Sequence, residues 1–323
     1  MSRLEGSALV TGSAGLVGSH LLERLLQEGC RVRAVVHRKE SRVRDPRVQW
    51  IQGDLRDLSF CRKAVEGIHW VFHCAANTSG AQTMAATPMV HVTPNIVMNA
   101  HLFEACYEAG VRKVLWLSST TGYPDTGSRP VTEEEMFNGE PYAKYFFVGW
   151  MKRYTEILAR TYSEKLPRKM PVLVLRPTNI YGEWDDFEPA TSHVLPALIR
   201  KVCERQDPLE VWGDGTDVRD VIHVQDMVEA MLRAMERLDT FCPLNIGLGK
   251  TLSVRDALKM MLEIEGYQPK VVYNASKPTM TPVRLLDVGK AERLLGFRAQ
   301  IGLREGVERP MRWYKENRLA AVR

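Results

Sequence analysis

The sequence lacks the features that mark a disulfide scaffold, a metal centre or a membrane protein. None of its six cysteines stands in a CxxC pair or a Cys/His cluster, so we expect reduced core thiols and no metal site. No apolar run approaches the roughly 18 residues of a membrane span, and the first residues lack the apolar segment of a signal peptide. We therefore expect a cytoplasmic protein without membrane contact.

An excess of charge of one sign is also missing. Lys and Arg number 44 against 39 acidic residues, which gives a formal net charge of +5. This excess is small and dispersed, so no nucleic-acid partner is expected. With 45% hydrophobic and 26% charged residues over 323 positions, the composition is that of a globular protein with one large or two packed domains.

Short β-branched runs alternate with amphipathic stretches along the first half of the chain. The strand-like runs are residues 8–10, 31–36, 48–52, 70–72, 114–117 and 172–175, and helical patterns lie at 19–27, 56–65 and 95–108. This order predicts a Rossmann-type doubly wound parallel sheet of the α/β class.

The pattern changes after Arg176, where loops rich in Pro, Gly and Asp are followed by further helical patterns at 191–204, 224–238, 254–265 and 304–317. These patterns predict a smaller C-terminal α/β substrate-binding lobe, with a cleft between the two lobes. We assign residues 1–178, with a return segment near 218–248, to the Rossmann domain, and residues 179–217 and 249–323 to the lobe.

Glycines recur where the first strand meets the first helix. Gly12 permits a tight turn, Gly15 lets a phosphate approach the backbone, and Gly18 lets helix and strand pack closely. The helix N-terminus adds an attraction for anions. The predicted dinucleotide-binding segment is Gly12, Ser13, Ala14, Gly15, Leu16, Val17 and Gly18; a purely structural turn is the alternative.

The residues after the second strand favour NADP over NAD. About 20 residues beyond the glycines, where NAD sites usually carry an acid, the chain has His37, Arg38 and Lys39. Basic groups there suit a 2′-phosphate, although a solvated basic loop would look the same. Asp54 follows the next strand, where it would either bind the adenine or cap a helix.

Several motifs together resemble the extended short-chain dehydrogenase/reductase family, most of whose members modify nucleotide sugars. They are the TGxxGxxG turn, Gly53-Asp54-Leu55, His73-Cys74-Ala75-Ala76, Asn95, the run from Leu117 through Ser119 to Tyr123, and Arg176-Pro177-Thr178-Asn179-Ile180-Tyr181-Gly182. The resemblance implies a nicotinamide cofactor whose further contacts are Leu55, Ala75, Ala76, Lys152 and Pro177.

Within that family, the C-terminal segments are similar to those of the GDP-L-fucose synthases, which implies a nucleoside-diphosphate sugar as substrate. The similar segments are residues 192–198, 211–224 and 276–288. A diphosphate favours guanidinium groups, and Arg219 and Arg284 lie in these segments, although either one could be a surface arginine. Asn179 would orient sugar or phosphate oxygens, or bind the backbone of its own loop.

The family's catalytic set is Ser/Thr, Tyr, and Lys four residues after the Tyr, and this chain departs from it. Ser119 and Lys152 fit two of the roles, but Val148 stands where the tyrosine is expected. Valine transfers no proton. Tyr145 lies about one helical turn upstream, with Tyr142 further along, so either phenol could substitute for the missing one or simply pack.

Two further positions correspond to the acid and base with which the GDP-L-fucose synthases epimerise their substrate. Thr121 stands where those enzymes have a cysteine, and its hydroxyl is a far weaker acid than a thiol, so double epimerisation is not expected. His193 occupies the position of their acid, and an imidazole is a suitable proton donor. A purely structural His193 is the alternative.

The sequence therefore predicts NADP(H)-dependent modification, most simply reduction, of a 4-keto nucleoside-diphosphate sugar. Two alternatives remain: an epimerase or dehydratase that retains NAD(P) and uses Lys152 as base, and a catalytically degenerate protein that only binds both ligands. The family usually dimerises through the lysine-bearing helix, whose aromatic side chains here are Phe146, Phe147, Trp150 and Tyr154, so a homodimer is expected. The same side chains could instead be buried within one subunit.

Overall fold

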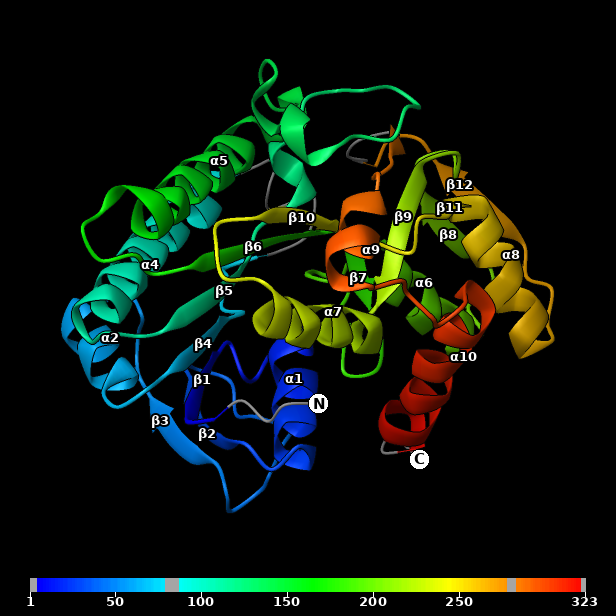
Figure 1. Cartoon of the computed structure of the whole chain (residues 1–323). Coiled ribbons are helices and arrows are strands. Elements are labelled where there is room, and N and C mark those ends of the chain that lie inside the picture. The colour runs from blue at the N-terminus through cyan, green and yellow to red at the C-terminus, as the bar shows by residue number, and fades with distance from the viewer. Residues whose placement is uncertain (1–4, 79–86, 278–282, 321–323) are drawn as a thin grey trace.

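A seven-stranded sheet, in which every strand pair is parallel, lies at the centre of the larger part of the molecule (Figure 1). The computed structural model describes residues 5–78, 87–277 and 283–320. The order is β10-β6-β5-β4-β1-β2-β3, with β1 (Ser7–Thr11), β2 (Arg31–Val36), β3 (Gln49–Gln52), β4 (Trp70–His73), β5 (Lys113–Leu117), β6 (Val172–Pro177) and β10 (Pro243–Ile246). The strand order reverses between β1 and β4, and ligands of such sheets bind at the carboxyl ends of the strands there.

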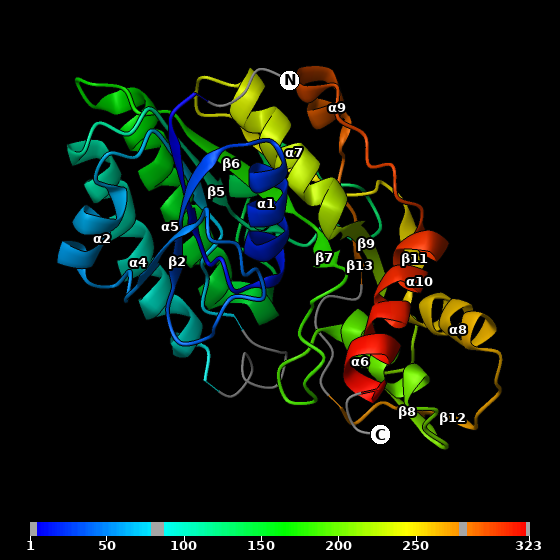
Figure 2. The same ribbon diagram turned by 90° about the horizontal axis from the view of Figure 1, so that it is seen from below.

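Helices cover both faces of the sheet (Figures 1 and 2). One face carries α1 (Leu16–Gln27) and α7 (Val224–Arg237), and the other carries α2 (Leu58–Val65), α4 (Met89–Glu108) and α5 (Phe146–Arg160). Because both faces are covered, the middle of β1 is continuously apolar instead of alternating: Ala8, Leu9 and Val10 are all buried. The predicted doubly wound Rossmann-type sheet is confirmed.

A separate hydrophobic core lies in the C-terminal lobe. Its strands are β7 (Asn179–Tyr181), β9 (Val218–His223), β11 (Thr251–Ser253) and β13 (Val283–Arg284) in one sheet, and β8 (Leu209–Trp212) and β12 (Val271–Asn274) in another. Its helices include α6 (Val194–Cys203), α8 (Val254–Glu265) and α10 (Leu303–Tyr314), while α9 (Gly289–Leu295) packs on α7 and β10. The smaller lobe is confirmed, and in residues 5–78, 87–277 and 283–320 no helix is long and apolar enough to cross a membrane.

Helix α4 differs from the sequence expectation because it begins at Met89 instead of Asn95 and contains Pro94. A proline within a helix removes one backbone hydrogen bond, because it has no N–H to donate to the carbonyl four residues earlier. That carbonyl belongs to Val90, and the side-chain amide of Asn77 donates to it at 2.6 Å. The replacement donor explains why the helix continues through the proline.

Candidate active site

The turn after β1 brings its backbone close to the loop after β4. Gly12 has a φ of +67°, and a Cβ there would lie 2.7 Å from the backbone nitrogen of Ala75. A Cβ at Gly18 would overlap the carbonyl oxygen of Gly12, so α1 packs directly on the turn. Gly15 is exposed, and no side chain caps the first turn of α1 behind it. The glycines therefore have the geometry expected of a phosphate-binding turn.

The surroundings of this turn also fit the pyrophosphate of a dinucleotide. The first backbone N–H groups of a helix have no partner within it, and here Leu16 and Val17 supply them without an acidic residue in the first turn. The hydroxyl of Ser13 is directed inward and donates to the Val35 carbonyl at 2.7 Å. Ala14 within the turn and Ala75 beside Gly12 add only small side chains, and Ala76 follows Ala75 along the chain.

The expected adenosine end lies after β2 and β3. His37, Arg38 and Lys39 are exposed just beyond β2. Asp54 is not a helix cap, because Asp57 caps α2 by accepting from the backbone N–H of Ser59. Instead, both Asp54 carboxylate oxygens accept from Arg56, at 3.0 and 2.9 Å, and this pairing lowers the Asp54 pKa to about 2.

Of the other expected cofactor contacts, Leu55 is buried in the hydrophobic core under α2, and its carbonyl accepts a hydrogen bond from the Cys61 thiol. Pro177 is the last residue of β6 and lies opposite Ile246 of β10.

Ser119, Thr121 and Lys152 gather at the carboxyl end of β5. The Thr121 hydroxyl donates to Ser119 Oγ at 3.1 Å, and Lys152 Nζ donates to the Leu117 carbonyl at 3.0 Å. The Lys152 ammonium also lies 4.8 Å from the centre of the Trp116 ring. Although the side chain keeps some exposed surface, desolvation by the surrounding protein lowers the Lys152 pKa to about 8, against the opposing attraction of Glu156. An amine with this pKa can exchange protons near neutral pH.

Val148 lies one turn before Lys152 on α5, and it is buried. The helix begins at Phe146, so the expected placement of Tyr145 one turn away on a similar face of the same helix is wrong in detail. Tyr145 ends a short 3-10 turn instead and serves as the N-cap of α5. Its ring centre lies 6.2 Å from that of Tyr142, and its phenol favours the charged form of Arg284, whose pKa burial lowers.

Arg219 and Arg284 are register partners on the neighbouring strands β9 and β13. Arg219 pairs with Asp217 at 3.0 Å. Arg284 is buried and donates through Nη1 to the Pro124 carbonyl at 3.0 Å, while its Nη2 has no hydrogen-bond partner in the described part of the chain. Two adjacent guanidinium groups, one with an unsatisfied donor, form a site that favours an anion.

Asn179 and His193 belong to elements of the C-terminal lobe. Asn179 is exposed at the start of β7, which pairs with β9. His193 is the N-cap of α6 and keeps exposed surface, while desolvation by nearby protein lowers its pKa.

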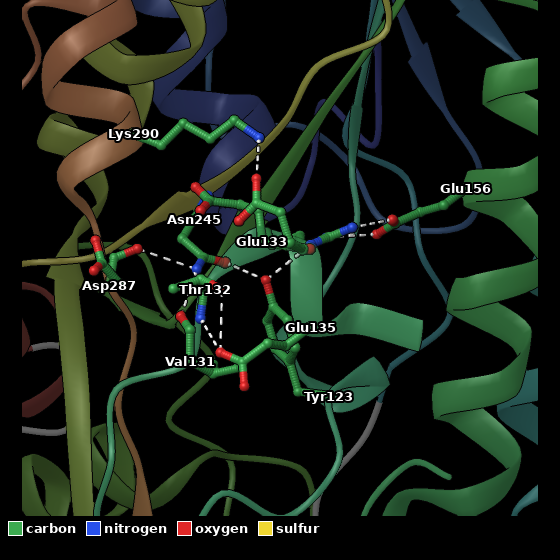
Figure 3. A network of polar contacts seen from close by, with 11 residues as sticks. Tyr123, Val131, Thr132, Glu133, Glu135, Glu156, Asn245, Asp287 and Lys290 are labelled. Atoms are coloured by element: carbon green, nitrogen blue, oxygen red, sulfur yellow. Dashed lines mark hydrogen bonds and ion pairs between the residues drawn. The ribbon is translucent and has the colours of Figure 1, made fainter. Parts of the chain in front are cut away.

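A buried polar network, which the sequence motifs did not predict, connects these elements (Figure 3). The Tyr123 hydroxyl donates to Asn245 Oδ1 at 2.6 Å, and Arg176 Nη1 donates to the Tyr123 oxygen at 2.8 Å. The backbone N–H of Asn245 donates to Glu133 at 2.8 Å. Arg176 also forms a bidentate pair with Glu156 of α5, at 2.9 and 2.5 Å. The one available signal was a charged residue, Arg176, directly after the apolar strand run 172–175.

With this geometry in place, comparison with known proteins gives the family. A protein-family profile described as the NAD dependent epimerase/dehydratase family matches residues 8–247. The chain belongs to that family. The matched range contains the glycine turn, Ser119, Lys152 and Arg219. The predicted likeness to GDP-L-fucose synthases is confirmed, because proteins of that name are among the similar relatives.

The family relatives cover nearly the whole chain. A GDP-L-fucose synthase of Escherichia coli (strain K12) is 30% identical and covers 95% of this chain and 96% of its own length. A dTDP-4-dehydro-6-deoxy-D-allose reductase of Streptomyces bikiniensis is 29% identical over 96% and 97% of the two chains. A solved dTDP-glucose 4,6-dehydratase of Streptomyces venezuelae, with NAD bound, superposes with a TM-score of 0.84 at 26% identity and covers 97% and 98%. The chain therefore belongs to a family of NAD(P)-dependent enzymes and is similar to members that modify nucleotide sugars.

Proposed function

We propose that this protein uses NADP(H) to reduce the 4-keto group of a nucleoside-diphosphate sugar, such as a GDP-sugar. The observation that carries the proposal is the register pair of Arg219 and Arg284, with the buried and unsatisfied Nη2 of Arg284. A diphosphate supplies oxygens for such donors. Arg284 bonds the Pro124 carbonyl in the loop that follows Ser119 and Thr121, so a sugar beyond the diphosphate would lie near these hydroxyls and Lys152.

The cofactor part of the proposal rests on the turn and on the residues after β2. The backbone around Gly15 would hold the pyrophosphate, and a bound nicotinamide would supply hydride to the keto carbon. NADP is favoured because His37 and Arg38 are exposed beyond β2, and because the nearby acid, Asp54, is already paired with Arg56. NAD is the alternative.

Protons would come from the groups around β5. The Lys152 ammonium, with a pKa of about 8, is the best candidate donor to the forming alkoxide. Ser119 and Thr121 would hold the sugar oxygen by hydrogen bonds. Tyr145 and His193 are further candidates for proton transfer. Val148 excludes the phenol that the family normally uses at that position.

Two other functions are each favoured by one observation. The low pKa of Lys152 would also suit the base of an epimerase or dehydratase that retains NAD(P) through the reaction. Val148 would equally suit a degenerate protein that only binds dinucleotide and sugar. We also propose that residues 1–178 and 218–248 form the cofactor domain and that the remaining residues form the substrate lobe, except that β9 (Val218–His223) pairs with β7, β11 and β13 and so belongs to the sheet of the lobe.

A homodimer is part of the proposal. Phe147, Trp150 and Tyr154 recur along one side of α5 and are 50%, 42% and 53% exposed. Monomers seldom leave such a strip uncovered, and a second copy of α4 and α5 would cover it.

Lys152→Met, Tyr145→Phe and Val148→Tyr test the catalytic assignment, with NADPH oxidation and nucleotide binding measured for each. We expect Lys152→Met to abolish turnover while GDP still binds and NADPH binds more weakly, because Lys152 is also an expected cofactor contact. Tyr145→Phe shows whether that phenol is needed, and Val148→Tyr should raise turnover if its phenol reaches the sugar. Full turnover by Lys152→Met would contradict the assignment.

A further inference from the structure

Glu156 lies on α5 one turn after Lys152, in the position where a helical ion pair would normally form. Residues four apart on a helix are neighbours on its surface, and a carboxylate beside a buried ammonium favours the charged form of that ammonium. In this structure, however, Lys152 Nζ donates to the Leu117 carbonyl, and no carboxylate in the described residues lies within ion-pair distance of it. The expected pair is therefore absent.

The Glu156 carboxylate is held on another side by three hydrogen bonds. Arg176 donates from Nε to Oε1 at 2.9 Å and from Nη2 to Oε2 at 2.5 Å. The Ser118 hydroxyl donates to Oε1 at 2.5 Å. Glu156 and Arg176 are both 1% exposed, and Figure 3 shows the Glu156 carboxylate reaching from its helix to a guanidinium group through two bonds. Bidentate pairs of this kind fix direction as well as charge.

We propose that Arg176 and Ser118 are positioning residues that hold the Glu156 carboxylate away from Lys152, and thereby keep the lysine able to exchange a proton near neutral pH. Both donors come from the carboxyl ends of neighbouring strands: Ser118 directly follows β5, and Arg176 belongs to β6. The sheet edge that carries the proposed site therefore also sets the charge state of its amine.

The other titratable groups around Lys152 do not set its charge state in place of Glu156. His73 of β4 accepts from Thr11 Oγ1 or donates to it at 2.7 Å through Nδ1, and its Nε2 lies 2.9 Å from Asn99 Oδ1. Burial lowers the His73 pKa to about 4, so the ring is uncharged at neutral pH. Arg176 is neutralised by Glu156 itself. A freed Glu156 carboxylate would thus be the group best placed to hold the proton on Lys152.

The inference rests on the proposed function for its catalytic meaning. The proton affinity of Lys152, however, can be measured without cofactor or substrate, so the inference and the proposed function can fail independently. The whole protein is trace-labelled with deuterated acetic anhydride between about pH 6 and 11, the range over which lysines titrate. Mass spectrometry then gives the half-titration point of the Lys152 amine. The exposed Lys259 serves as internal reference. Circular dichroism checks that each variant folds.

Arg176→Met should raise the half-titration point of Lys152 by about one pH unit or more, because the freed carboxylate then turns to the ammonium. Ser118→Ala, which removes one bond and little volume, should raise it by a few tenths of a unit. The double variant Glu156→Met/Arg176→Met removes both charges and should show no rise. If Arg176→Met does not fold, Ser118→Ala decides the question. The inference would be overturned if the half-titration point of Lys152 stayed at its wild-type value in every single variant that folds. It would also be overturned if that point rose in the double variant.

Discussion

Gly15→Val should separate cofactor binding from folding. Gly15 is the N-cap of α1 with extended backbone, φ −88° and ψ 172°, which valine adopts readily. A Cβ there would meet only the Gly12 carbonyl oxygen, at 3.2 Å, so the fold should lose under about 1 kcal/mol. The added side chain would instead fill the space in which a pyrophosphate approaches the turn. We expect NADPH affinity to fall by about 100-fold, or about 2.8 kcal/mol.

A matched control comes from the other lobe. Gly302 is the N-cap of α10, with similar extended backbone, φ −68° and ψ 160°, and a Cβ there would meet nothing within 4 Å. Isothermal titration with NADPH, together with thermal unfolding of the nucleotide-free proteins, compares Gly15→Val with Gly302→Val. Both should unfold near the wild-type temperature, and only Gly15→Val should lose binding. NADPH affinity within about twofold of wild type in a folded Gly15→Val protein would refute the assignment of the turn.

Four further outcomes are expected. Arg284→Met should raise the KM for a nucleotide sugar by about 100-fold with little change in NADPH affinity, whereas an unchanged KM would exclude diphosphate contact. In the reductive direction, the rate should fall as pH rises through about 8, because the Lys152 ammonium is the donor; a rate that rises there would favour its role as base. Asp185→Asn should stabilise the protein at pH 8 more than at pH 4, because burial raises the Asp185 pKa to about 7. Charging the buried carboxyl lowers the free energy of unfolding as pH rises from the ordinary pKa of aspartate to about 7, and asparagine removes this loss. Thermal unfolding at both pH values checks the sign. Trp150→Glu should convert a dimer to a monomer in sedimentation experiments, and a wild-type monomer would exclude the dimer.

The fold was predictable because its elements leave local signals. Continuous apolar runs such as residues 114–117 mark strands covered on both faces, and the glycines of the first turn mark the dinucleotide crossover. Short strands of the lobe gave no such signal: β13 has only two residues, and its pairing with β9 depends on distant parts of the chain.

Contacts within the site were predictable only in part. The roles of Ser119 and Lys152 were expected from the family resemblance, and the structure brings both to the end of β5. Sequence could not show that Asp54 pairs with Arg56, or that Glu156 pairs with Arg176 and not with Lys152. Each pairing depends on which side chains the fold brings together. Local periodicity carries no information on such partners.

The most direct test of the proposed reduction follows deuterium from cofactor to product. The purified protein is incubated with excess NADPH that carries deuterium at both C4 positions and with a panel of 4-keto nucleoside-diphosphate sugars, GDP-linked sugars first. The products are read by NMR and mass spectrometry. The account predicts one deuterium at the former keto carbon of the product and one NADP formed per sugar reduced. Sugar conversion without deuterium and without net NADPH consumption, or tight binding of both ligands without any conversion, would contradict it.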